Sequence, residues 1–440
     1  MADNAESGHE ERTIVLVTGA NSGLGFSICC RLVDDFLRTS NPPHALTVIF
    51  TTRSTKKATD TLQRLQQHLV DSGQPRSSSR VTFVPESVDL ASLVSVRALS
   101  RRLLSSFPKL NSVILNAGLG GWTGIHWPLA IWTVLTDLIH AVSWPAFKLA
   151  SAGVVTDPQT RLGPETEPRL GAVFCANVFG HYMLAHNVVP LLKRAGDPTA
   201  AAGRIVWVSS LEATVNLLDV DDLQGLRTAA PYESSKALTD VLAITADMPS
   251  SAPWVKSFYS VDNANTITTD ADAKQPTMYL SHPGICGSGI LPLSLPLYYL
   301  MMAAFWLARV LGSPWHTLST YLGACAPVWL ALSPRSALDD AEAPYRRHGG
   351  GRVKWGSSCS LFGCERPVCT EVDGWGFGGV VGPAVLEEDR CRRRKRGAAD
   401  LTRERKVEFE VLGRECWRRM EELRVQWDAL LDRAEGLDST

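Results

Sequence analysis

Several side chains that can together bind and protonate the oxygen of a carbonyl group occur at informative positions along the chain. Tyr232 and Lys236 lie four residues apart, so on a helix they share one face. A nearby ammonium stabilises tyrosinate and lowers the pKa of the phenol, which makes proton transfer to a carbonyl oxygen possible near neutral pH. Ser209 and Ser210 end a predicted strand, where a hydroxyl can hydrogen-bond a substrate oxygen as charge develops on it. Asn177 could hold a water that relays protons to Lys236.

A glycine-rich loop near the N-terminus predicts a nucleotide site. Residues 18–25 read Thr-Gly-Ala-Asn-Ser-Gly-Leu-Gly, directly after an apolar strand and before a predicted helix. Glycines let the backbone turn tightly and approach a pyrophosphate, which binds at the positive N-terminus of the next helix. The pattern alone is weak evidence, and a plain strand-to-helix turn is the alternative, but this position makes it specific. The predicted contacts are Gly19, Asn21, Ser22, Gly23, Leu24 and Gly25.

The end of the second predicted strand indicates which nucleotide. An NAD site normally has a carboxylate there for the ribose hydroxyls, whereas a 2′-phosphate requires cations. After Arg53 the chain continues with Lys56 and Lys57, and no acid occurs before Asp60. Arg53 can bind a phosphate with two parallel hydrogen bonds, and Lys56 or Lys57 can add charge. NADPH is therefore favoured over NADH, although one of the lysines could simply be a solvated helix start.

Two further segments fit the same nucleotide. Asp89 follows the third predicted strand, where a carboxylate can accept a hydrogen bond from the adenine amino group. Asn116, Ala117 and Gly118 close the fourth strand with a turn of small residues that can lie against the cofactor.

The order of these elements indicates a parallel sheet. Short β-branched runs alternate with helical stretches, which is typical of a sheet covered by helices on both faces. The predicted strands are 14–18, 46–52, 81–87, 112–116, 203–209 and 277–282, with helices such as 25–37, 56–70 and 93–107 between them. This predicts an α/β chain with a Rossmann-type doubly wound sheet.

Together these residues resemble the short-chain dehydrogenase/reductase family over roughly 13–333. The resemblance implies a catalytic tetrad of Asn177, Ser210, Tyr232 and Lys236, with Ser210 preferred to Ser209 because the family usually uses the second of two serines. It also implies cofactor contacts at Pro283, Gly284 and Ser288, although Ser288 stands where the family has a threonine that touches the nicotinamide carboxamide.

Within that family the chain resembles the 3-keto-steroid (3-keto-sterol) reductases, most closely the fungal group that completes C-4 demethylation in ergosterol synthesis. The segments that carry this resemblance are 179–181, 218–223 and 231–240, with the insertion after Asn116 and the apolar region after Gly284. The resemblance implies reduction of a 3-keto-sterol to the 3β-alcohol by NADPH. It also implies a place on the endoplasmic reticulum membrane, on its cytosolic face, or on lipid droplets, beside the other C-4 demethylation enzymes and their scaffold.

The residues favour a lipophilic substrate independently. Trp122, Trp127, Trp132 and Trp144 cluster in one insertion, and apolar residues dominate 291–332. The most apolar part, 297–308, is shorter than the about 20 residues that span a bilayer, so we expect an interfacial helix or a substrate lid. Core packing or a dimer interface is the alternative for both segments.

The expected organisation has four parts. A disordered N-terminus at 1–12 precedes a catalytic domain at 13–342, which contains insertions at 119–170 and 249–276 and a membrane-associating apolar segment at 291–333. A Gly- and Cys-containing loop region follows at 343–386, then a charged helical tail at 387–440. Within the tail, 407–431 predicts an amphipathic helix that docks on the catalytic domain or on a partner.

Other classes of site are disfavoured. The net charge of −1 gives no reason to expect nucleic acid. The ten cysteines are scattered and the first twelve residues are polar, which favours a reducing compartment facing the cytosol. Cys359, Cys364 and Cys369 lack paired Cys-x-x-Cys spacing, so we expect no metal site. The basic run 390–396 could bind anionic lipid or form a solvated loop. Another lipophilic carbonyl, such as a retinoid or polyketide, and a non-catalytic NADPH-binding scaffold are the alternative functions.

Overall fold

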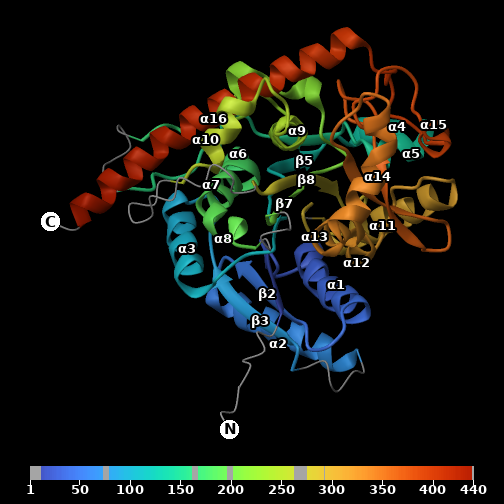
Figure 1. Cartoon of the computed structure of the whole chain (residues 1–440). Helices are drawn as coiled ribbons and strands as arrows, with labels where there is room; N and C mark the ends of the chain where they lie inside the picture. The colour runs from blue at the N-terminus through green and yellow to red at the C-terminus, as the bar shows by residue number, and fades with distance from the viewer. Residues whose placement is uncertain are drawn as a thin grey trace.

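A twisted sheet of eight strands forms the centre of the part of the chain that the structure describes (Figure 1). This computed structural model describes residues 11–72, 79–160, 167–195, 202–261, 275–291 and 293–438. The strand order is β10-β9-β8-β7-β4-β1-β2-β3, and only β10 runs antiparallel to its neighbour. The strands are β1 (Arg12–Val17), β2 (Ala45–Thr52), β3 (Val81–Ser87), β4 (Ser112–Leu115), β7 (Arg204–Val208), β8 (Thr277–His282), β9 (Lys354–Cys359) and β10 (Glu365–Thr370).

Alternate residues of each central strand enter two separate cores. In β1, Leu16 belongs to the core on one face of the sheet, while Val15 and Val17 belong to the core on the other. A parallel sheet buried on both faces requires such nearly continuous apolar strands, and β2 is buried at every position. The predicted doubly wound fold is confirmed, and the six predicted strands agree with β1, β2, β3, β4, β7 and β8 to within two residues at each end.

Helices cover both faces. One core includes side chains of α1 (Gly23–Thr39), α2 (Thr55–Asp71), α13 (Cys325–Leu332) and α14 (Arg335–Arg347). The other includes side chains of α3 (Leu93–Ser106), α7 (Gly180–Asn187), α9 (Pro231–Thr245) and α10 (Ala252–Tyr259). Shorter helical segments connect them: α6 (Ala172–Phe174), η1 (Cys175–Phe179), α8 (Val189–Lys193), η2 (Val215–Leu217), η3 (Val220–Asp222) and α12 (Thr320–Gly323).

The tryptophan-rich insertion forms a small unit of its own beside the sheet. It contains β5 (Trp122–Ile125), α4 (Trp127–Thr136), α5 (Leu138–Ser143) and β6 (Lys148–Ala150), and β5 pairs antiparallel with β6. Helix α5 packs against α11 (Leu295–Val310), which comes from the apolar segment after β8. The two apolar regions of the sequence therefore lie side by side.

Three expectations about the segments between and after these elements need correction. The expected loop region 343–386 contains β9 and β10, which extend the main sheet, so the sheet does not end at residue 342. The expected loop or insertion at 249–276 begins with helix α10, while its residues 262–274 lie outside the described residues, as does most of 1–12. Within 291–333 only α11 is broadly exposed, because α13 packs into the core against the sheet.

The charged tail packs on the catalytic fold. After α15 (Glu387–Cys391), helix α16 (Arg403–Asp438) lies across α9 and α10 (Figure 1). Its buried face includes Phe409, Cys416, Trp417, Met420, Trp427, Leu430 and Leu431. In the basic run 390–396, each of the six cations pairs with an acidic side chain, which leaves little free charge for a lipid surface. The partners are Asp137, Glu371, Asp373, Glu387 and Asp389.

Candidate active site

A cavity of about 770 Å³ opens at the carboxyl ends of β1, β4 and β7. In an open α/β sheet, ligands bind at this edge, where the chain winds away in opposite directions. Among the predicted residues, those that line the cavity are Gly19, Asn21, Ser22, Gly23, Leu24, Gly25, Arg53, Asp89, Asn116, Ala117, Gly118, Ser210, Tyr232, Lys236, Pro283, Gly284 and Ser288. Lys56 and Asn177 do not line it.

The glycine loop is shaped to receive a dinucleotide. Gly19 has a φ of +71°, and a Cβ atom at Gly25 would lie 2.1 Å from the carbonyl oxygen of Gly19, so a side chain at either position is disfavoured. The Asn116 amide donates to the carbonyl of Thr18 at 3.0 Å, which fixes the turn after β4 against this loop. The loop and the N-terminus of α1 thus line the cavity, where a helix N-terminus can bind a pyrophosphate.

The adenosine end of the cavity presents one cation. Arg53 is exposed and lines the cavity, whereas Lys56 is exposed on α2 and does not line it. Arg64, which is not among the predicted site residues, donates to the backbone carbonyl of Asn21 at 3.1 Å and lies over the ring of Phe26. Arg64 therefore supports the glycine loop from outside the cavity.

Tyr232 and Lys236 occupy one face of α9, whose N-terminus is set by Pro231. The Lys236 ammonium donates to the carbonyl of Val208 at 2.8 Å and lies 5.9 Å from the centre of the Tyr232 ring. Burial lowers the pKa of Lys236 to about 8, and the positive charge of Lys354 acts in the same direction while Asp240 opposes both. The hydrogen bond to Val208 therefore holds the charged end of Lys236 at the carboxyl end of β7.

The pKa of Tyr232 differs from the expectation. Burial raises it above the usual value, the carboxylate of Glu212 raises it further, and a hydrogen bond with Ser210 acts in the opposite direction. The expected lowering is thus outweighed by the loss of solvent around the phenol. At neutral pH the phenol carries its proton, which is the form that a proton donor needs.

Asn177 supports the site rather than facing it. It lies in the π-helical turn η1, is buried, and accepts a hydrogen bond from the backbone N–H of Leu119 at 2.8 Å. Its amide donates to the carbonyl of Leu119 at 3.0 Å and to the hydroxyl of Ser235 at 3.1 Å. Asn177 therefore holds the turn after β4 against α9, and its role in a water relay stays a prediction.

The substrate side combines apolar walls with one charged pair. The Trp122 ring packs against Tyr232 with 4.7 Å between ring centres, and the Lys148 ammonium lies 3.7 Å from the centre of the Trp122 ring. Lys148 also pairs with Glu212. Lys148 and Glu212 are not among the residues predicted from the sequence, although Glu212 follows Ser210 by two residues. Apolar side chains complete the wall: Ile131, Val134, Leu297, Met301, Ala304 and Phe305.

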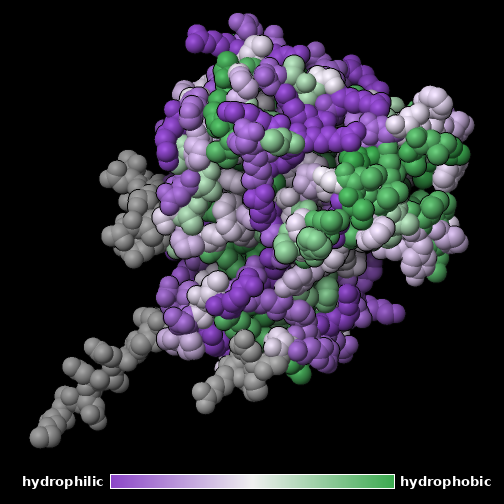
Figure 2. Space-filling model, turned by 90° about the vertical axis from the view of Figure 1, so that its right-hand side faces the viewer, coloured by the Kyte–Doolittle hydropathy of each residue, from purple (hydrophilic) through white to green (hydrophobic). Residues whose placement is uncertain are grey.

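Two helices that line this apolar part of the cavity, α4 and α11, also expose apolar side chains. Trp132 and Leu135 of α4 are 66% and 79% exposed, and Leu300 and Trp306 of α11 are 65% and 59% exposed. Figure 2 shows apolar side chains gathered on the face that carries these helices. In the described part of the chain, no helix combines the length and the apolar character needed to cross a bilayer. The same residues also contain no group of three or more His, Cys, Asp or Glu side chains placed to hold a metal ion.

The doubly wound sheet, the glycine loop after β1 and the joined Ser210, Tyr232 and Lys236 define an oxidoreductase of the short-chain dehydrogenase/reductase class, with a site for a nicotinamide cofactor. Comparison with known proteins is more specific. The chain is 70% identical to the 3-keto-steroid reductase erg27 of Aspergillus fumigatus over 97% of this chain and 96% of the relative. It is therefore a member of the 3-keto-steroid reductase family.

More distant relatives carry the same name. The 3-keto-steroid reductase ERG27 of Gibberella zeae is 38% identical over 96% of this chain and 95% of the relative. The 3-keto-steroid reductase erg27 of Schizosaccharomyces pombe is 33% identical over 82% and 91%, respectively. No family model matches the chain. Among solved structures, the RhlG/NADP active-site complex of Pseudomonas aeruginosa is 17% identical, with a TM-score of 0.39, over 72% of this chain and 89% of that one.

Proposed function

We propose that this chain reduces the ketone of a 3-keto-sterol to the 3β-alcohol with NADPH, as the last step of C-4 demethylation in ergosterol synthesis. The observation that carries the proposal is the place of Tyr232. Its phenol lies where the cradle for a dinucleotide meets an apolar cavity wall, beside Ser210. The family membership supports the steroid as substrate.

The residues of the chain bind the carbonyl oxygen and supply the proton that it receives. NADPH, when bound, supplies the hydride that the carbonyl carbon receives. Ser210 donates a hydrogen bond to the carbonyl oxygen, and Tyr232 transfers its proton to that oxygen as negative charge develops. The ammonium of Lys236 stabilises the tyrosinate that remains, and the proton returns from solvent. Asp89, Arg53 and the glycine loop would hold the adenosine and phosphate part of the nucleotide, and Pro283, Gly284 and Ser288 would contact its nicotinamide end.

The test of the function is NADPH oxidation by the purified protein with a 3-keto-sterol. We expect turnover and a 3β-hydroxysterol as product, identified by mass spectrometry and chromatography against the 3α-isomer. Retinal and a polyketide ketone serve as competing substrates. Turnover of those carbonyls without turnover of the sterol would overturn the substrate assignment. Binding of NADPH without turnover of any carbonyl would indicate the non-catalytic scaffold.

Arg53 should decide the preference for NADPH. Replacing Arg53 with Ala removes a charge-assisted hydrogen bond to the 2′-phosphate worth about 1.5–3 kcal/mol, so kcat/KM for NADPH should fall roughly 10- to 100-fold. The value for NADH should change little, because NADH lacks that phosphate. Lys56→Ala is the matched control, since Lys56 is also exposed but does not line the cavity. Equal effects of the two variants on NADPH would contradict the role of Arg53.

We further propose that α4 and α11 place the cavity mouth on a lipid surface, at the cytosolic face of the endoplasmic reticulum membrane or on lipid droplets. Both helices line the apolar part of the cavity, and both also carry exposed apolar side chains. Because the six cations of 390–396 are paired within the fold, the contact is apolar rather than electrostatic. Other C-4 demethylation enzymes and their scaffold would meet this protein on the same surface.

Trp132 and Leu135 provide the test of membrane contact. Replacing both with Ser should weaken binding to neutral phospholipid vesicles at least tenfold in a flotation assay, because burying each side chain contributes about 1.5–3 kcal/mol. Phe362→Ser is the control, since Phe362 is 90% exposed in the turn between β9 and β10. Unchanged binding of the double variant, or an equal loss in the control, would overturn the proposed surface.

A further inference from the structure

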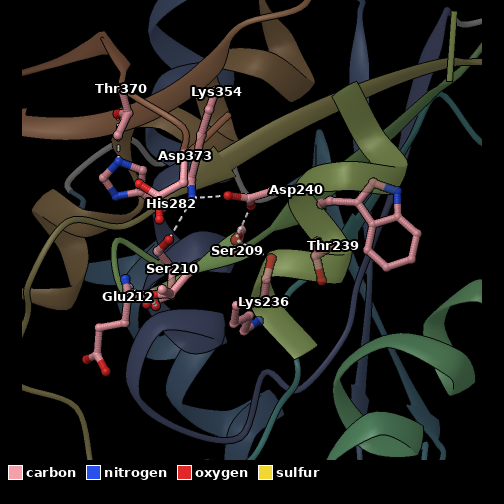
Figure 3. Close-up of polar contacts among 12 residues, drawn as sticks. Ser209, Ser210, Glu212, Lys236, Thr239, Asp240, His282, Lys354, Thr370 and Asp373 are labelled. Atoms are coloured by element: carbon pink, nitrogen blue, oxygen red, sulfur yellow. Dashed lines mark hydrogen bonds and ion pairs between the residues drawn. The ribbon is translucent and has the colours of Figure 1, made fainter. Parts of the chain in front are cut away.

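A buried ion pair lies behind the site, outside the cavity. Lys354, the first residue of β9, is 3% exposed and donates to the Asp240 carboxylate at 2.5 Å. Its ammonium also donates to the backbone carbonyl of Ser210 at 2.7 Å (Figure 3). Neither Lys354 nor Asp240 lines the cavity. The pair therefore contacts the proposed active-site residues from within the protein and not from the cavity.

The other carboxylate oxygen of Asp240 links α9, which carries Asp240, to the end of β7. That oxygen accepts a hydrogen bond from the hydroxyl of Ser209 at 2.5 Å, and this hydroxyl lies 3.3 Å from the carbonyl of Lys236. Asp240 lies one helical turn after Lys236 on α9. The end of β7 is thus tied to α9 through Ser209, through the Ser210 carbonyl and through the Lys236 ammonium on Val208.

Stability alone does not explain why a buried ion pair occurs at this position. Removing two charges from water is expensive, and well-packed apolar residues can often replace a buried ion pair without loss of stability. What apolar residues cannot do is orient the peptide that follows Ser209. The Lys354 ammonium fixes the Ser210 carbonyl, and the hydroxyl of Ser210 in turn accepts from the backbone N–H of Glu212 at 3.1 Å.

We propose that Lys354 and Asp240 are positioning residues that clamp Ser210 at the end of β7 onto the helix carrying Tyr232 and Lys236. This inference rests on the proposed function, because it assigns the clamp a role in the same reduction. Neither residue touches the substrate or the reacting atoms. Their effect reaches the reaction through the orientation of Ser210 and through their charges near Lys236.

The charges give the clamp a signature in pH dependence. The groups that face Lys236 are Tyr232 and Asp240 on its own helix, Lys354 on β9 and His181 on α7. Burial keeps His181 neutral by lowering its pKa to about 3. Lys354 lowers the pKa of Lys236 and Asp240 raises it. Since reduction needs the charged form of Lys236, the rate should fall as pH rises past about 8.

The groups around Lys354 do not reverse the directions in which Lys354 and Asp240 shift the pKa of Lys236. Asp373 raises and Lys395 lowers the pKa of Lys354, in addition to the larger effects of burial and Asp240. Burial, then Lys354 and Arg392, hold the pKa of His282 well below its usual value, so this imidazole is neutral. Removing the charge of Lys354 should therefore move the alkaline limb of Lys236 upward, and removing that of Asp240 should move it downward.

The experiment compares Lys354→Met, Asp240→Asn and the double variant in the full-length protein. In the double variant we expect kcat for the 3-keto-sterol to fall roughly 10- to 100-fold while KM stays within about threefold, because Ser210 loses its fixed orientation. The alkaline limb of the pH profile should move up in Lys354→Met, down in Asp240→Asn, and stay near the wild-type value in the double variant. The single variants leave one buried charge unpaired, so the double variant provides the measurement if a single variant does not fold.

Arg424→Met with Glu421→Gln is the control, because this buried pair on α16 lies away from the cavity. It should lower the melting temperature without moving the alkaline limb. Unchanged kcat in the double variant, or limbs of the single variants that move in the same direction, would overturn the clamp while the proposed function stands. A wild-type protein that turns over no ketone would overturn the proposed function and the clamp together.

Discussion

Tyr232→Phe should lower kcat for reduction of a 3-keto-sterol by roughly 10²- to 10⁴-fold, the range that a positioned proton donor contributes. Phenylalanine keeps the ring that packs on Trp122 at 4.7 Å and removes only the hydroxyl. Binding of NADPH should remain, because the glycine loop and Arg53 are untouched. The measurement is steady-state NADPH oxidation, together with cofactor binding followed by fluorescence.

Tyr279→Phe is the matched control for this loss. Tyr279 lies on β8, is 3% exposed, and within the described residues its hydroxyl has no hydrogen-bond partner. Removing that hydroxyl should leave both kcat and stability nearly unchanged. If Tyr232→Phe retained more than a tenth of the activity, another group would have to protonate the substrate oxygen. Glu212, which lies beside the phenol in the cavity, would then be the next residue to replace.

The sheet could be predicted where the sequence was apolar and regular. Strands such as β2 are buried on both faces, so their apolar composition alone predicts them. Glycines after β1 and the pair Ser209 and Ser210 after β7 indicate where those strands end. Strand β9 was not predicted because its sequence is Lys-Trp-Gly-Ser-Ser-Cys. Its polar side chains are buried, and specific hydrogen-bond partners satisfy them. Lys354 is satisfied by Asp240 and Ser357 by the carbonyl of Gly323, contacts that no local pattern announces.

The candidate site was predictable to the same degree. Residues that follow strands at one sheet edge must meet, so the glycine loop, Asn116 and Ser210 could be placed together. Lys148 and Glu212 could not, because Lys148 reaches the cavity only through the fold of the insertion. Lys56 shows the opposite case. A charge of the right type at nearly the right position does not line the cavity.

The tail posed a different problem, because an amphipathic helix reveals its apolar face but not what covers it. The apolar pattern expected within 407–431 consists of Phe409, Val411, Leu412, Cys416, Met420, Leu423 and Trp427. Four of these side chains are buried, Leu412 and Leu423 are partly buried, and Val411 is 44% exposed. Trp417 was not part of that pattern, yet it is fully buried between Phe258 and Tyr182. Helix α16 is thereby part of the core that holds α9, rather than an appended tail.

Trp417→Ala should test this role of α16 through stability. The side chain is fully buried, its indole N–H donates to the carbonyl of Leu242 on α9 at 3.2 Å, and its ring lies 5.6 Å from that of Phe258. Truncating a buried tryptophan costs about 3–5 kcal/mol, so the melting temperature should drop clearly in calorimetry.

Val425→Ala on the same helix is the control, because Val425 is 54% exposed and should change stability by less than about 0.5 kcal/mol. Since α9 carries Tyr232 and Lys236, the loss of Trp417 should also reduce activity at temperatures well below unfolding, where Val425→Ala remains fully active. Equal melting temperatures for the two variants would mean that α16 leaves α9 in solution. The proposed clamp on Ser210 would then have to hold α9 against β7 without support from this helix.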